Sequence, residues 1–469
     1  MNDERHISHC ASDCIAAIAT PPGRGALGIV RLSGADALVV ADRVFRPRRG
    51  AALAARRAWT VVLGSIVDEM DIVDEALATV FHAPQSYTTE EMVELSCHGG
   101  QAVLARVLDA VLRQGARLAQ PGEFTRRAFL NGRIDLTQAE AVLHLIDAPT
   151  DRARRAALRQ LDGALKLRLQ HIHQSLRTLR VQLEAAIEFA DDVGDVFADR
   201  AALAARLATH VDELRILARG AETGRRLHDG VRVALAGRPN AGKSSLFNWL
   251  AREERALVTP IPGTTRDTIE VDIACDGVPV RVIDTAGMRR ARGAIEQQGI
   301  RRARHMLADS DYVLWLCDLT RRPARDDVAF ARACLGATPA VWVWTKADLA
   351  APWPASARAP IAAAWRTITI SVKTGAGMPA CESVLAELVR AQCGSQDDHV
   401  IMVNARQRDL LARALEALER AYAGATTAAL AELLVEDVRA AQDAIGEMTG
   451  AVTSEEVLDA LFAQFCIGK

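Results

Sequence analysis

The chain has 469 residues, half of them apolar and a quarter charged, with nine cysteines and a formal net charge of −2 at pH 7. This length is enough for several domains with cores of their own, and the near-neutral charge argues against a broad surface that coats nucleic acid. Scattered single cysteines, no apolar stretch long enough to span a membrane and no charged-then-apolar leader predict a cytoplasmic protein without a membrane anchor.

The first part of the chain has the pattern of an α+β domain. Strand-like apolar runs cover residues 15–19, 27–32, 59–67, 76–81 and 92–97, and an amphipathic helix covers residues 101–114. Glycines gather at residues 23–25 and 99–100, where turns alone would explain them. We expect residues 1–133 to form an N-terminal α+β domain.

A helical region follows. Apolar residues spaced by threes and fours from Leu158 to Ile187 form one face of a single long helix, and the pattern continues from Leu203 to Leu217 after an acidic break. An extended coiled coil is the alternative, but the break and the alanine-rich flanks favour a helical bundle. Helical periodicity resumes at Leu410 and runs on to the C-terminus.

The segment Gly237-Arg-Pro-Asn-Ala-Gly-Lys-Ser244 matches the phosphate-binding pattern G-x-x-x-x-G-K-[ST]. A strand-like run precedes it and a helix start follows, which is the setting that such a loop needs. Backbone N–H groups would then face phosphate oxygens, Lys243 would reach the β- and γ-phosphates, and Ser244 would hold Mg²⁺. A plain glycine turn between a strand and a helix is the alternative.

Further motifs follow in the order of a nucleotide-binding sheet. Asp284-Thr-Ala-Gly287 ends a strand-like run, where the Asp can hold Mg²⁺ through water and the Gly can offer its N–H to the γ-phosphate. Residues 263–267 form a candidate switch loop, whose Thr265 could complete the Mg²⁺ shell. Asp348 can accept both donors of guanine, a pair that adenine lacks, and residues 371–373 resemble the loop that meets guanine O6. Together the motifs predict a GTPase.

Two positions depart from the usual GTPase motifs. Thr345 stands where the base-reading motif normally begins with Asn. It lacks the amide that would bond guanine N7 and brace the phosphate loop, so we expect a lower affinity, while Asp348 keeps the specificity. Met288 stands where many GTPases place the glutamine that orients the attacking water, so another group must do that work.

The GTPase motifs all lie within one segment flanked by helical sequence. We therefore expect a discontinuous α-helical domain, made of residues 134–229 and 394–469. An α/β P-loop GTPase domain of the Ras-like kind, residues 230–393, is inserted between the two pieces. Nucleotide-driven movement could then act on both connections at once.

Several other segments match one known family. They are residues 19–25, 28–34, 94–100, 121–131 and 135–140, together with the ending Phe465-Cys-Ile-Gly-Lys469. A C-terminal Cys-x-Gly-Lys beside an inserted GTPase domain is specific to the MnmE (TrmE) family of tRNA modification GTPases, which this chain resembles over its whole length. The resemblance implies a homodimer built through the N-terminal domains, and a heterotetramer with a partner called MnmG or GidA that carries FAD.

The resemblance also implies a reaction. With its partner, a family member installs a carboxymethylaminomethyl or aminomethyl group on carbon 5 of the wobble uridine of certain tRNAs, and a tetrahydrofolate derivative supplies the one-carbon unit. Matched by motif, the folate site would use Arg31, Glu94, Arg133 and Lys469. The two arginines suit the folate carboxylates, and Glu94 suits the pterin donors. The family often has Lys where Arg133 stands, which keeps the charge but changes the donor geometry.

Finally, the resemblance implies how hydrolysis proceeds without the glutamine. Family members dimerise their GTPase domains around a K⁺ ion, which offsets charge that develops in the transition state. Glu296 matches the acid that positions the attacking water through a further water. The implied catalytic residues are Glu296, Asn240 and Lys243; the K⁺ ligands are Asn240, Thr259, Ile261 and Thr264; the Mg²⁺ ligands are Ser244 and Thr265. The predicted nucleotide-binding residues are Asn240, Ala241, Gly242, Lys243, Ser244, Ser245, Thr259, Pro260, Ile261, Pro262, Gly263, Thr264, Thr265, Asp284, Thr285, Ala286, Gly287, Thr345, Lys346, Ala347, Asp348, Ser371, Val372 and Lys373.

The sequence leaves two alternatives open. One is a GTPase assembly factor that binds ribosomal RNA without modification chemistry, although the net charge of −2 and the lack of an RNA-binding motif count against it. The other concerns Cys466, which matches a family cysteine and is either a buried small hydrophobe or a reactive thiol.

Overall fold

The computed structural model describes residues 13–188, 199–252, 269–284, 307, 309–322, 325–349, 354, 358–394, 401–427 and 430–469. Internal contacts divide the chain into two units: the N-terminal unit, Met1–Leu143 with Ile445–Lys469, and the central unit, His144–Ala444. No helix among the described residues is long and apolar enough to cross a membrane. The four predicted segments divide the chain differently and stay a prediction.

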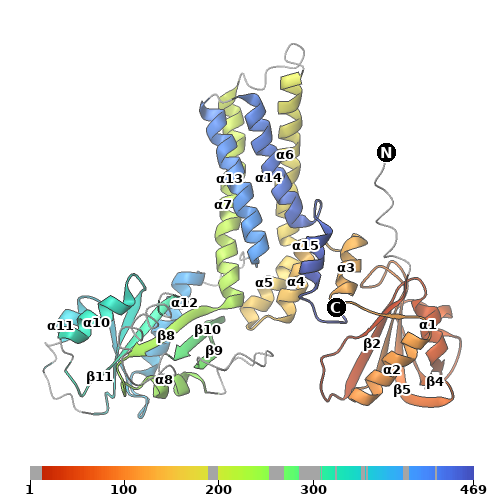
Figure 1. Cartoon of the computed structure of the whole chain (residues 1–469), viewed down its shortest axis with the longest axis horizontal. Helices are drawn as coiled ribbons and strands as arrows, with labels where there is room; N and C mark the ends of the chain where they lie inside the picture. Colours follow the sequence, from red (N-terminus) through yellow and green to blue (C-terminus); the bar gives the residue numbers. More distant parts are fainter. Residues whose placement is uncertain are drawn as a thin grey trace, which may run out of the picture. The chain divides into compact units, whose positions relative to one another are not determined.

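The N-terminal unit is built on a seven-stranded sheet with the order β3-β4-β5-β6-β2-β1-β7. One face packs against helices α1 and α2, and along β4 and β5 the opposite face is exposed: Val62 and Ala78 are buried, while Leu63 and Leu77 are exposed. The predicted α+β pattern is confirmed. The elements are β1 Ile15–Ile18, β2 Leu27–Ser33, α1 Ala37–Val44, β3 Phe45–Pro47, the short helix η1 Leu53–Ala55, β4 Thr60–Asp68, β5 Asp71–Phe81, β6 Met92–His98, α2 Gln101–Arg113 and β7 Arg117–Leu118. Figure 1 labels α1, α2, β2, β4 and β5 among them.

The C-terminal end of the chain packs into this same unit. After the sheet, the chain forms helices α3 (Glu123–Leu130) and α4 (Leu136–Ile146), and α4 begins in the N-terminal unit and ends in the central unit. Helix α15 (Glu455–Phe462) comes from the C-terminal part of the chain. The backbone N–H of Phe124 donates to the carbonyl of Lys469 at 3.1 Å. Gly468 has a φ of +98°, and a Cβ there would lie 2.4 Å from the carbonyl of Ile18. Only glycine fits so close to the first strand.

Helices make up a bundle (Figure 1): α5 Asp151–Leu161, α6 Ala164–Glu188, α7 Arg200–Asp229, α13 Ala405–Thr427 and α14 Ala431–Thr449, all within the central unit except the end of α14. Helices α7 and α13 pack together and are joined by an ion pair between Arg215 and Glu419 at 2.7 Å. The predicted bundle is confirmed. The single helix expected from Leu158 to Ile187 is wrong, because Gly163, at a φ of +92°, ends one helix and lets the next begin.

A six-stranded sheet with the order β13-β12-β11-β8-β10-β9 lies in the same unit, and all its strands are parallel except β9. Its parallel strands read as continuous apolar runs because both faces are covered by separate apolar clusters. The predicted P-loop α/β architecture is confirmed. The elements are β8 Val231–Gly237, α8 Lys243–Leu250, β9 Ile269–Cys275, β10 Val278–Asp284, β11 Tyr312–Asp318, α10 Arg325–Leu335, β12 Ala340–Thr345, α11 Ala359–Ala362, β13 Arg366–Thr369 and α12 Met378–Cys393.

Candidate functional site

The predicted nucleotide motifs that the structure describes converge on one edge of the six-stranded sheet. The strand register pairs Asp284 with Leu235 and Asp318 with Thr345, so the carboxyl ends of these strands lie level with one another. Strand β8 runs directly into the phosphate-loop segment, and Ser371 follows β13. In parallel sheets this edge is where ligands bind, because the loops there converge from several strands.

The phosphate-loop segment curls around its own lysine. Nζ of Lys243 donates to the carbonyl oxygens of Gly237 and Arg238, both at 2.9 Å, and the lysine is buried. The backbone reaches this shape through positive φ angles of 137° at Gly237, 59° at Asn240 and 93° at Gly242. Glycine and asparagine are the residues that tolerate such angles best. The loop therefore brings an ammonium to the N-terminus of α8.

Beside the lysine, a hydroxyl and a carboxylate lie together. Oγ of Ser244 donates to Oδ2 of Asp284 at 3.3 Å, and Asp284 is buried at the end of β10. Oxygen ligands of these two kinds are what Mg²⁺ prefers. The pair therefore suits a magnesium site next to the phosphate loop.

Thr345 connects the phosphate loop to the base-reading motif. Its buried Oγ1 donates to the carbonyl of Ala241 at 2.7 Å, with the carbonyl of Cys317 at 3.3 Å. The expectation that threonine cannot brace the phosphate loop is therefore wrong, since a hydroxyl at the strand end reaches the loop carbonyl. Loss of the contact to guanine N7 stays a prediction.

This contact yields a first expected outcome. Thr345→Val keeps the shape of the side chain but removes the donor from buried carbonyl oxygens, so we expect it to destabilise the fold by about 1–3 kcal/mol. Denaturation followed by circular dichroism would measure this change. Thr345→Ser keeps the hydroxyl and is the matched control. Equal stability of Thr345→Val and the unmodified chain would contradict the bracing role.

The base-reading carboxylate is held by a neighbouring strand end. Oγ of Ser371 donates to Oδ1 of Asp348 at 2.7 Å, and the backbone N–H of Ala347 donates to the carbonyl of Ile370 at 3.1 Å. The hydrogen bond from Ser371 lowers the pKa of Asp348, so the exposed carboxylate is ionised at neutral pH. Lys373 lies exposed on the turn after Ser371.

Ser245 lies exposed on α8 and Val372 is half-buried beside Lys373, while several other predicted nucleotide and ion residues lie outside the described part of the chain. This holds for Glu296, for the whole segment Thr259, Pro260, Ile261, Pro262, Gly263, Thr264 and Thr265, and for Thr285, Ala286 and Gly287. The role of Glu296 in positioning water and the binding of K⁺ by the loop of residues 259–264 therefore stay predictions. Of the implied K⁺ ligands, the structure describes Asn240, which has an exposed side chain at the tip of the phosphate loop.

In the N-terminal unit, three of the four predicted folate residues lie close together. Arg31 and Glu94 are cross-strand partners on β2 and β6, and their side chains form an ion pair at 2.7 Å. Nη1 of Arg31 also donates to the carbonyl of Gly468 at 3.2 Å, which brings the C-terminal tail to the pair. Burial and the charge of Arg31 lower the pKa of Lys469, the last residue of that tail.

Aromatic rings that the motif reasoning missed complete this cluster. The guanidinium of Arg31 lies 5.7 Å from the ring centre of Tyr87 and 5.6 Å from that of Phe124. Arg133, the fourth predicted residue, lies 4.9 Å from the ring centre of Tyr87 and donates to the carbonyl of Tyr87 at 2.7 Å. Phe124 lies within residues 121–131, which match a motif of the family, so the sequence could have indicated this ring. Tyr87 lies outside every motif.

The exposure of Cys466 removes one of its two interpretations. The cysteine is exposed and unpaired, so it is not a buried small hydrophobe. Its backbone carbonyl accepts from the N–H of Gly122 at 3.4 Å, which ties the tail to the start of α3. The interpretation as a reactive thiol stays a prediction.

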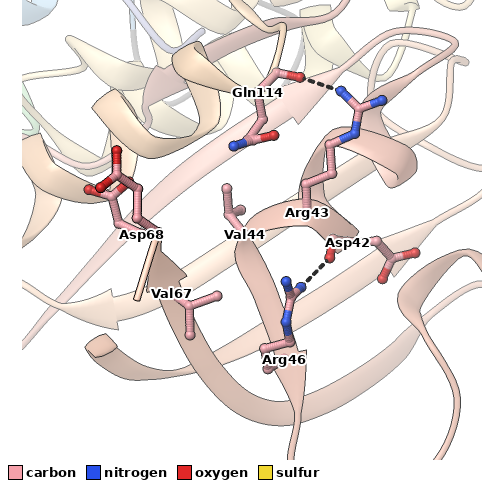
Figure 2. Close-up of a pocket in the computed structure, with 8 residues that line it drawn as sticks. Asp42, Arg43, Val44, Arg46, Val67, Asp68 and Gln114 are labelled. Atoms are coloured by element: carbon pink, nitrogen blue, oxygen red, sulfur yellow. Dashed lines mark hydrogen bonds between the residues drawn. The ribbon is translucent and has the colours of Figure 1, made fainter. Parts of the chain in front are cut away.

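A separate cavity of about 450 Å³ opens elsewhere in the N-terminal unit, and Figure 2 shows its lining. Arg43 donates to the carbonyl of Gln114 at 2.9 Å and Arg46 to the carbonyl of Asp42 at 2.8 Å. The buried Asp68 is paired with Arg106 at 2.6 Å. Two lining arginines are thus bonded to carbonyl groups of other lining residues, and none of the predicted site residues lines the cavity.

Comparisons with known proteins cover nearly the whole chain. Residues 136–466 match the model of the MnmE helical domain, and residues 14–133 match that of the GTP-binding protein TrmE N-terminus. The tRNA modification GTPase MnmE of Symbiobacterium thermophilum is 46% identical over 97% of this chain and 99% of its own length. The proteins of that name from Chlorobaculum tepidum and Geobacter metallireducens are 43% and 40% identical over 97% of this chain, and over 97% and 99% of their own lengths.

Proposed function

The chain belongs to the MnmE family of tRNA modification GTPases, and on that premise we propose that it couples GTP hydrolysis to modification of the wobble uridine of certain tRNAs. As an enzyme, it is a GTP hydrolase that acts in tRNA modification. The observation that supports the proposal most directly is the shared sheet edge that carries Lys243, the Ser244–Asp284 pair and the Ser371–Asp348 pair.

At the proposed nucleotide site each group has one task. Lys243 leaves its loop carbonyls for the β- and γ-phosphates, and the N–H groups of residues 240–245 surround the phosphate oxygens. Ser244 and Thr265 would hold Mg²⁺ when it is bound, and Asp284 would act on the ion through water. Asp348 accepts the two donors of guanine, while the loop from Ser371 to Lys373 closes over its O6.

The proposed hydrolysis depends on K⁺. When bound between the GTPase domains of two copies, the ion would be held by the side chain of Asn240 and by backbone oxygens of residues 259–264. A cation beside the γ-phosphate offsets charge that develops as the phosphate bond breaks. Glu296 holds the attacking water through a second water, in place of the glutamine that Met288 replaces.

The proposed modification chemistry takes place at the folate site. A tetrahydrofolate derivative supplies the one-carbon unit when bound. Arg31 and Arg133 bind its carboxylates, Glu94 accepts from the pterin donors, and Lys469 adds a positive charge from the C-terminal tail. The ion pair between Arg31 and Glu94 and the hydrogen bond from Arg31 to the C-terminal tail support a shared polar site here, because a donor and an acceptor lie side by side.

We further propose that the protein works in the cytoplasm as a homodimer. It forms a heterotetramer with MnmG (GidA), whose FAD provides the redox chemistry, and it binds tRNA. Together the two proteins install the carboxymethylaminomethyl or aminomethyl group on carbon 5 of the uridine. The proposed GTPase domain, residues 230–393, drives this assembly by moving the two pieces of the helical domain that flank it.

Mass spectrometry of tRNA nucleosides tests the function as a whole. Cells that lack this protein should lose the modified wobble uridines, and the unmodified chain should restore them. Lys243→Ala, which removes the phosphate-binding ammonium, should fail to restore them although the protein accumulates normally. Unchanged wobble nucleosides in the deleted strain would reject the modification function and favour the assembly-factor alternative.

A further inference from the structure

A carboxylate that no sequence motif singled out lies at the base-reading edge of the sheet. Asp318 ends β11, in register with Thr345 on β12. Its Oδ2 accepts from Nζ of Lys346 at 2.5 Å. Its Oδ1 accepts from the backbone N–H and from the hydroxyl of Thr320, at 2.9 and 2.7 Å. The carboxylate is therefore fixed on both sides, and only one of its partners belongs to the predicted nucleotide site.

The pair between Asp318 and Lys346 is charged. Burial would raise the pKa of Asp318, but the hydrogen bonds from Lys346 and Thr320 outweigh burial and lower it. The side chain of Asp318 is 14% exposed and that of Lys346 is 37% exposed, so solvent screens the pair only in part. The lysine backbone has a φ of +59°, which fixes where its flexible side chain starts.

Lys346 lies within electrostatic reach of two carboxylates. The hydrogen bond from Ser371 is the main cause of the lowered pKa of Asp348, and the charges of Lys373 and Lys346 lower it further. Asp348 is also the group that must offer its oxygens to guanine. An ammonium that moved onto Asp348 would compete directly with the two guanine donors. In the structure, the hydrogen bond that Lys346 makes is to Asp318.

We infer that Asp318 is a positioning residue that holds Lys346 away from Asp348 and thereby keeps the base-reading carboxylate open for guanine. The inference rests on the proposed nucleotide site and adds a specificity determinant to it. Asp318 touches neither base nor phosphate; it acts through Lys346. Removing the charge of Asp318 should therefore weaken guanine binding only while the lysine is present.

A double-mutant cycle tests this dependence. The binding of a fluorescent GDP analogue is measured for the full chain, for Asp318→Asn, for Lys346→Gln and for the double variant. Asp318→Asn should weaken binding about tenfold, and the double variant should bind as well as Lys346→Gln alone. Competition with inosine diphosphate, which lacks the exocyclic amine, gives a second measurement: the preference for GDP over inosine diphosphate should fall in Asp318→Asn. A merely structural role would not move that ratio.

Controls separate this inference from general damage. Asp276→Asn removes another carboxylate of the same domain, which pairs with Arg390 at 3.1 Å, and should leave GDP binding unchanged. Thr320→Val removes one bond to Asp318 and should shift binding in the same direction by less, which keeps the test available if Asp318→Asn is unstable. Unchanged binding in Asp318→Asn, or equal losses with and without Lys346, would overturn the inference. Failure of the unmodified chain to bind GDP would instead overturn the proposed nucleotide site.

Discussion

Asp348→Asn is expected to change the nucleotide preference of this protein from guanine towards xanthine. Ser371 donates to Oδ1 of Asp348 at 2.7 Å, so an asparagine there should keep its oxygen on Ser371 and present its NH₂ group to the base. This NH₂ group would then face the exocyclic amine of guanine, which is also a donor. Xanthine carries a carbonyl oxygen in place of that amine. We expect the preference for GTP over XTP to fall by about 10³-fold or more.

Steady-state hydrolysis with each nucleotide measures this change. Ser371→Ala is the matched control, because it frees the carboxylate without changing its charge and should weaken binding of GTP while preserving the preference for guanine. An unchanged ratio of GTP to XTP turnover in Asp348→Asn would reject Asp348 as the base-reading residue.

Replacing K⁺ by Na⁺ is expected to lower the rate of GTP hydrolysis about tenfold or more, with little change in GTP affinity. The cation acts on charge that is present mainly in the transition state, so turnover should respond and ground-state binding should not. Hydrolysis is measured in matched chloride salts at saturating GTP and Mg²⁺, over a range of protein concentrations because the proposed site needs two copies.

Asn240 offers the variant that isolates this mechanism. It has a φ of +59°, so alanine there would strain the loop, whereas Asn240→Gly allows the same backbone shape and removes the side chain that carries the amide oxygen. In Asn240→Gly, the two salts should give nearly equal rates while GTP still binds. A persistent advantage of K⁺ would show that Asn240 is not a ligand, and equal rates in the unmodified chain would remove the cation mechanism itself.

Local sequence patterns predicted the strands in which the order of apolar and polar residues is regular along the whole strand. The apolar runs of β8 and β12 are buried on both faces, and β4 and β5 alternate between core and solvent, so each of these strands was visible in sequence. The break between α5 and α6 was missed because the apolar spacing continues through Gly163 while the backbone does not. Short elements such as β3 and β7 carry too few residues to show a period.

The candidate nucleotide site was predictable because its residues follow one another along short motifs whose backbone shape is local. The role of Thr345 was predicted wrongly because it depends on a residue that lies far away in the sequence. Its hydroxyl meets the carbonyl of Ala241, which is remote in sequence and is brought near only by the parallel order of β8, β11 and β12. Asp318 was not singled out because an aspartate at the end of an apolar strand matches no motif by itself. Its inferred role depends on its contact with Lys346.

By itself, the sequence determined the GTPase class, the order of the nucleotide motifs, the helical bundle and the family, since each depends on residues close together in the chain or on similarity along its whole length. Only the tertiary structure decided which distant groups meet. It brought Tyr87 to Arg31, the tail at Gly468 to the first strand, and Asp318 to Lys346. Such contacts depend on strand order and close packing between remote segments, and no local spacing records either of them.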